Sequence, residues 1–187
     1  MSFTVKKVAL AVAACSVMAL SASSMASTLV FTGAVTSSTC DVQAVSSAGV
    51  VTPEIQLGNV APDTTTALPV AVAFKLSPIN TASCTQTNAD ITWSSPNLIQ
   101  AGLANTGTAT GVHIELKPQA TGNALDGASA VHANDVIRGG LNTVKYSVST
   151  GTLSGSFDYT AQLVRDAGAT PTAGTVGSMA TYTVAYY

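Results

Sequence analysis

The chain has 187 residues, of which only 9% are charged, with seven Lys and Arg against nine Asp and Glu. This length suits one domain with a sizeable core, and the slightly acidic balance argues against a nucleic-acid partner, because phosphate contacts need clustered Lys and Arg. Thr, Val, Ser and Gly are abundant, a composition that favours strands and turns over helices.

The first 26 residues predict an export signal. Lys6 and Lys7 precede thirteen uncharged residues, Val8 to Leu20, and a run of small residues follows. This apolar segment is shorter than the about 20 residues that a membrane-spanning helix needs, and its flanks are typical of a secretory signal peptide. Cleavage after residue 26 would leave a mature chain that begins at Ser27; cleavage a few residues earlier and a retained membrane anchor are the alternatives.

Removal of the signal also removes Cys15 and leaves two cysteines, Cys40 and Cys84. An even pair in an exported protein predicts one disulfide, and two free thiols are the alternative. On the loop-entropy model, a disulfide across this loop would stabilise the fold by about 4 kcal/mol.

Strand-like segments follow one another after the signal. Residues 28–35 alternate, and one face of the predicted strand carries Leu29, Phe31, Gly33 and Val35. Further strands are predicted over 40–45, 54–60, 68–76, 89–94, 111–117, 143–148 and 155–164, with segments rich in turn-forming residues between them, such as 95–111 and 118–135. Many short strands at this spacing predict one all-β domain, a sandwich of the immunoglobulin type.

The last fourteen residues, 174–187, show the same alternation. One face of this predicted strand carries Val176, Ser178, Ala180, Tyr182, Val184 and Tyr186. No further strand follows in this sequence to form a hairpin with it. An unpaired strand edge beside an open core is costly in water and invites pairing with another chain.

The segment 28–35 precedes the first cysteine and lies outside the part of the chain that a disulfide would tie together. It can cover the edge of the last strand by folding back within its own chain or by inserting into a neighbouring copy. Head-to-tail insertion does not close and therefore builds a filament. We predict the second arrangement, an incomplete immunoglobulin-like sandwich that lacks its last strand and is completed by a donor strand in trans. An ordinary first strand of its own sheet is the alternative.

Both ends of the chain resemble those of pilin subunits that Gram-negative bacteria assemble by the chaperone–usher pathway, and the similarity covers residues 27–187. In that family an alternating extension that includes a glycine precedes the first cysteine, as "LVFTGAVTSSTC" does here. The family's disulfide pair matches Cys40 and Cys84. Its glycine fourteenth from the end and its penultimate aromatic match Gly174 and Tyr186, although Gly174 is by itself also explained as a turn glycine. The segments "FKL", "GVHIEL" and "FDYTAQL" also look like blocks of shaft pilins.

This resemblance implies a signal peptide (1–26), a donor-strand extension (27–36) and a pilin domain (37–187). It implies that the next subunit receives Leu29, Phe31, Gly33 and Val35. It assigns the acceptor groove and the surface recognised by a chaperone to Gly174, Val176, Ala180, Tyr182, Val184, Tyr186 and Tyr187. The implied partners are other copies of the chain, a periplasmic chaperone that lends a strand during folding, and an outer-membrane usher. Export through the periplasm to an adhesive surface fimbria would follow.

Little in the sequence points to catalysis, a cofactor or a metal. His113 shares a strand face with Glu115, opposite to three apolar neighbours, which predicts a solvated histidine. His132 lies in a loop near Asp126 and Asp135, but a metal site would need a further ligand at suitable spacing. A secreted monomeric enzyme would need a nucleophile motif beside one of these histidines. We therefore expect a structural subunit without enzyme activity, metal or cofactor.

A shaft subunit that itself binds carbohydrate is the alternative function, with a host glycan receptor as a further partner. The first candidates for stacking on a sugar are the aromatic residues Trp93, Tyr146, Tyr159 and Tyr187. For Trp93, however, packing in the core is the more economical explanation.

Overall fold

The computed structural model describes residues 27–35, 40–58 and 70–187, and for residues 27–35 it describes the backbone alone. The predicted signal peptide over 1–26 lies outside the described residues, as do residues 36–39 and 59–69. Within the described part, no helix is long and apolar enough to cross a membrane. Its helical residues are confined to the single 3-10 turn η1 (Thr81–Ser83).

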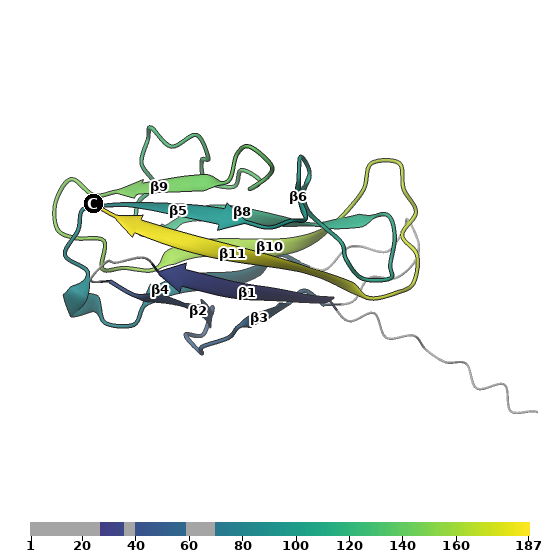
Figure 1. Cartoon of the computed structure of the whole chain (residues 1–187), viewed down its shortest axis with the longest axis horizontal. Coiled ribbons are helices and arrows are strands. Elements are labelled where there is room, and N and C mark those ends of the chain that lie inside the picture. The colour runs from purple at the N-terminus through teal and green to yellow at the C-terminus, as the bar shows by residue number, and fades with distance from the viewer. Residues whose placement is uncertain (1–26, 36–39, 59–69) are drawn as a thin grey trace, which may run out of the picture.

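Eleven strands form two facing sheets in the described part of the chain (Figure 1). Sheet A contains, in spatial order, β3 (Glu54–Gln56), β1 (Ser27–Val35), β11 (Val176–Tyr186), β5 (Asn88–Ser94) and β9 (Thr143–Ser147). Sheet B contains β2 (Val42–Ser46), β4 (Val72–Pro78), β10 (Phe157–Arg165), β8 (Val112–Gly122), β7 (Gly102–Ala104) and β6 (Leu98–Ile99). The predicted all-β, immunoglobulin-like sandwich is confirmed.

Alternating apolar residues build the core between the sheets, because successive side chains of a strand point to opposite faces. In β11 the buried face consists of Val176, Ser178, Ala180, Tyr182 and Val184, each at most 5% exposed. Between them, Met179 is 53% exposed. The alternation predicted for the last strand is therefore confirmed.

Aromatic rings fill the middle of this core. Trp93, Tyr146 and Tyr159 are each at most 1% exposed, and the Tyr159 ring lies 5.1 Å from the Trp93 ring. The Tyr146 hydroxyl donates a hydrogen bond to the Tyr159 hydroxyl at 2.9 Å, and burial raises the pKa of both tyrosines. Packing of Trp93 in the core is confirmed. Three of the four aromatic residues proposed for sugar stacking are thus inaccessible, and of the four only Tyr187 is exposed.

The largest departure from the predicted strands lies in the segment 95–111, which we expected to be a loop. It contains the short hairpin β6–β7, in which Leu98 pairs with Leu103. Leu103 in turn lies opposite Ile114 of β8. Strands of two and three residues are too short to show an alternating pattern, so the sequence carried no signal for them. The strand β8 was predicted to end at residue 117 but continues to Gly122, because its C-terminal end pairs with β10, with Gly122 opposite Phe157.

The prediction of a solvated His113 is wrong. His113 is only 7% exposed, and its Nδ1 lies 2.7 Å from Oδ1 of Asp166. The strand pattern placed this residue correctly on the outer face of sheet B, beside Glu115. Its burial comes from the loop that follows β10, which covers this part of the face and which strand periodicity cannot reveal.

Candidate functional site

The last strand, β11, is paired on both of its edges (Figure 1). On one edge, residues 181–186 pair antiparallel with β5. On the other edge β1, from the opposite end of the same chain, runs parallel to it from Ser27 opposite Val176 to Val35 opposite Val184. In this single chain the N-terminal segment therefore closes the sheet in cis. That is the alternative the sequence left open, whereas we had predicted a strand supplied in trans.

The register of β1 places each predicted donor residue beside the buried face of β11. The pairs are Leu29 with Ser178, Phe31 with Ala180, Gly33 with Tyr182, and Val35 with Val184. Residues in register share a face of the sheet. The largest residue of the donor set stands beside the small Ala180, and its glycine stands beside the large Tyr182.

The backbone groups on one edge of β11 find their hydrogen-bond partners in β1. On the opposite edge, the N-terminal half of β11 bonds a loop: the Thr106 amide donates to the Gly177 carbonyl at 2.8 Å and the Gly177 amide donates to Asn105 Oδ1 at 2.9 Å. The Ser95 hydroxyl donates to the Met179 carbonyl at 2.6 Å. Backbone groups of successive residues in a strand point to opposite edges. The alternate residues therefore direct their amides and carbonyls to β1, and without a strand there these groups would be unpaired. They are Val176, Ser178, Ala180, Tyr182 and Val184.

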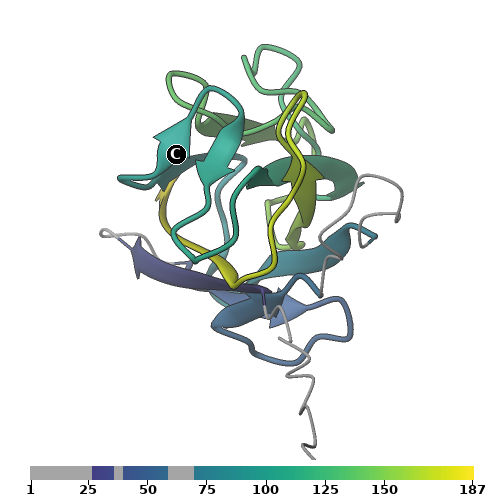
Figure 2. The ribbon, with the colours of Figure 1, turned by 90° about the vertical axis from the view of Figure 1, so that its right-hand side faces the viewer.

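Gly174 lies just before this ladder, which begins at Val176. A side chain at Gly174 would overlap the backbone of Thr108 and Ala109, and the Ala109 amide donates to the Thr175 carbonyl at 3.0 Å. Figure 2 shows the two loops, 105–111 and 166–175, side by side at this end of the sandwich. Gly174 is therefore required for the close approach that docks the start of β11, and it does not itself face β1.

The other end of β11 contacts the disulfide. Cys40 and Cys84 are bonded, as predicted, and both are at most 2% exposed. The Tyr186 hydroxyl, which carries the only proton available for donation in this contact, lies 3.2 Å from Cys40 Sγ. Tyr187 instead pairs its backbone with Asn88, on the β5 side, at 3.1 Å. Of the two terminal tyrosines, the Tyr186 side chain thus lies toward the disulfide on the inner side of the sheet. The Tyr187 backbone pairs on the edge of β11 that faces β5.

Tyr186 should make stability depend on pH at alkaline values. Burial, together with the nearby charge of Asp41, raises the pKa of Tyr186 to about 12. Because the folded-state pKa is higher than the about 10 of an unfolded tyrosine, the neutral side chain stabilises the fold below pH 10, and this contribution is lost as pH rises through 12. We expect the free energy of unfolding, measured by urea titration, to fall across this interval and to fall less in Tyr186→Phe. Equal pH slopes for the two proteins would contradict this assignment.

The site extends beyond the predicted residues through a cleft of ≈ 280 Å³ beside Tyr182. Residues of β2 and of the segment after it line this cleft, namely Val42, Gln43, Ala44, Val51, Thr52 and Pro53. The Tyr182 hydroxyl lies 3.4 Å from the Val42 carbonyl oxygen. Alternation predicted the strand that carries Val42 and Ala44, but only the packing of the two sheets brings it beside Tyr182. Ser178 was likewise absent from the predicted acceptor set although it is buried within β11.

Among the described residues, no three His, Cys, Asp or Glu side chains lie close enough together to hold a metal ion. His132 is exposed, and its Nδ1 lies 3.3 Å from Oδ2 of Asp135. What the edge of β11 offers is a row of backbone donors and acceptors above an apolar core. Its chemistry is the binding of an extended strand.

Comparison with known proteins agrees with this geometry. A family model described as "Fimbrial protein" matches residues 29–187, from within β1 to the last residue. A search of curated proteins found no match. Because the family match spans most of the sequence and includes both the closing strand and its acceptor, the chain belongs to the fimbrial protein family and is a fimbrial subunit.

Proposed function

We propose that this structural subunit polymerises by donor-strand exchange, in which the N-terminal segment of one copy replaces β1 beside β11 of the next copy. The observation that carries the proposal is the pairing of β11: one of its edges is covered by a strand from the opposite end of the chain. Once the predicted signal peptide is removed, this segment would be attached only through the residues before Cys40 and could leave one acceptor and enter another without unfolding the rest of the sandwich.

The direction of β1 favours such an exchange. Val35 and Cys40 are five residues apart, so their Cα atoms lie within about 18 Å of each other. Cys40 contacts Tyr186 at the C-terminal end of β11, which is about 33 Å long at the usual rise per residue. In cis, β1 must therefore end near that end of β11, and it can only lie parallel.

Every other ladder between the described strands is antiparallel, and antiparallel pairing is slightly more stable per residue than parallel pairing. A strand from a second copy is free of the short connection and can enter antiparallel. Inserted into the groove, Leu29, Phe31 and Val35 would bury their side chains at about 1.5–3 kcal/mol each. Since each copy donates once and accepts once, the assembly grows head to tail without closing.

The same edge suggests how the subunit is handled before assembly. Exposed, β11 would pair with any available strand and aggregate. We propose that a periplasmic chaperone covers this edge with a strand of its own, and that an outer-membrane usher exchanges that strand for the next subunit's extension during export to an adhesive fimbria. The aromatic residues do not favour the alternative of sugar stacking, because only Tyr187 of the four is exposed.

A pair of adjacent substitutions tests the donor role. Gly33 stands opposite the buried Tyr182, whereas Ala34 stands opposite the exposed Thr183. We expect Gly33→Arg to prevent incorporation, because its charged side chain would face the core, and Ala34→Arg to permit it. The measurement is the ladder of detergent-resistant polymers sheared from the cell surface and run on a gel without boiling.

Accumulation of soluble subunit in the chaperone complex is the folding control for both variants. Ladders of equal intensity from Gly33→Arg and Ala34→Arg would contradict the face assignment. So would loss of the ladder in Ala34→Arg alone.

A further inference from the structure

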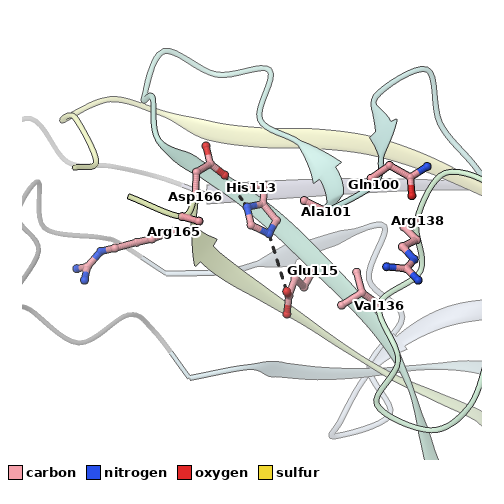
Figure 3. A pocket seen from close by; sticks show the side chains of 9 residues that line it. Gln100, Ala101, His113, Glu115, Val136, Arg138, Arg165 and Asp166 are labelled. Carbon is pink, nitrogen blue, oxygen red and sulfur yellow. Dashed lines mark hydrogen bonds and ion pairs between the residues drawn. The ribbon is translucent and has the colours of Figure 1, made fainter. Parts of the chain in front are cut away.

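A concave site lined mainly by polar and charged residues lies on sheet B, the sheet that contains neither β1 nor β11 (Figure 3). Its volume is ≈ 470 Å³, within the range of small-molecule sites. The outer face of β8, the turn between β6 and β7, the segment 136–138 and the loop after β10 form its walls. The residues that matter here are Gln100, His113, Glu115, Val136, Arg138 and Asp166.

Charges inside the pocket largely compensate one another. His113 Nδ1 lies 2.7 Å from Asp166 Oδ1 and His113 Nε2 lies 3.9 Å from Glu115 Oε1. The second oxygen of Glu115 is 2.6 Å from Lys117 Nζ. Each carboxylate therefore already has a basic neighbour, so a bare cation would find no unpaired carboxylate here. Arg165 also lines the pocket, but in Figure 3 its guanidinium points away from His113 and Glu115. Beside Arg138, the two carboxylates would repel a strongly charged anion.

Donors and acceptors nevertheless surround the same space. In Figure 3 the Arg138 and Gln100 side chains stand on one side and the Glu115 carboxylate on the other, with Val136 between Glu115 and Arg138. Among the described residues Arg138 forms no ion pair, so the five N–H donors of its guanidinium are available. The Gln100 amide is held in place by donating to the Gly139 carbonyl at 3.0 Å.

We propose that this pocket binds a neutral saccharide. Sugar hydroxyls donate and accept hydrogen bonds at once, which matches an arginine and a carboxylate that face each other across one cavity. The apolar face of a sugar ring would lie on Val136. The contact of His113 with Asp166 holds the loop after β10 against β8. Saccharide binding in this pocket does not require strand exchange.

The test uses fimbriae purified from cells that express the wild-type chain or a variant. Applied to an array of immobilised neutral, N-acetylated and sialylated oligosaccharides, wild-type fimbriae should bind at least one neutral saccharide. Arg138→Ala and Glu115→Gln should each weaken that binding by about tenfold or more, the effect of losing one hydrogen bond to a charged group. Lys75→Ala removes a charge from the same sheet outside the pocket and should leave binding unchanged.

Each variant is first checked for a normal polymer ladder, so that a failure of assembly, which concerns strand exchange, is separated from a failure of binding. A second measurement needs no variant: the bound saccharide should protect Arg138 of wild-type fimbriae from modification by phenylglyoxal, as read by peptide mass spectrometry. Absence of binding to every neutral saccharide, binding to sialylated glycans alone, binding unaffected by both pocket variants, or unprotected Arg138 would each overturn the proposal.

Discussion

A chain that lacks residues 27–35 is expected to form no polymer while keeping its acceptor edge. The deletion removes the strand that pairs with residues 176–184 of β11, and also the partner of β3, which bonds β1 through Leu29 opposite Ile55. The backbone groups on that edge would then be open to any extended peptide. The expected product is a subunit that persists only in complex with a chaperone, and the measurement is the absence of a detergent-resistant ladder from cells that export it.

A synthetic peptide of residues 27–36 provides the matched rescue. Added to the deleted chain as it is refolded in vitro without chaperone, the peptide should bind one to one and raise the midpoint of thermal unfolding of the subunit, because it restores both the backbone ladder and the apolar cover of the core. The same peptide with Gly33→Arg should do neither, since Gly33 stands opposite Tyr182. Polymers of normal length from the deleted chain would refute donation by this segment, and equal rescue by the two peptides would refute the assigned face.

Removal of the disulfide is expected to cost about 4 kcal/mol of the free energy of unfolding, the loop-entropy value for the sequence separation of 44 between Cys40 and Cys84. Both sulfur atoms are buried, and the Tyr186 hydroxyl contacts Cys40. The loss should therefore also loosen the end of β11. Replacement of both cysteines by Ala avoids the extra cost of burying a hydroxyl group at either position.

Urea unfolding of the full chain, refolded without chaperone and usher, measures this effect. Reduction of the wild-type protein is the control, because it opens the same bond without changing the sequence, and it should shift the midpoint by a similar amount. A loss below about 1 kcal/mol would show that residual structure in the unfolded chain already brings the two cysteines together.

Local patterns were sufficient for much of the fold. Alternation alone predicted which residues of β11 share a face, because the two-residue period of a strand is a property of its own backbone. The buried face was implied by the resemblance to pilins. The even pair of cysteines left after removal of the predicted export signal predicted the bond between Cys40 and Cys84. The pairing of large with small residues between β1 and β11 also follows from the order of Phe31 and Gly33 along the sequence, once the register is known.

Tertiary structure decided what depends on contacts between distant segments. Alternation cannot distinguish a closing strand in cis from one in trans, since the two arrangements use the same residues. Within one chain, the parallel direction of β1 comes from the short connection between Val35 and Cys40. Burial of His113 and the pocket around Arg138 depend on loops that fold over the outer face of sheet B. A residue's position along a strand determines its face, but what covers that face is determined by parts of the chain far away in sequence.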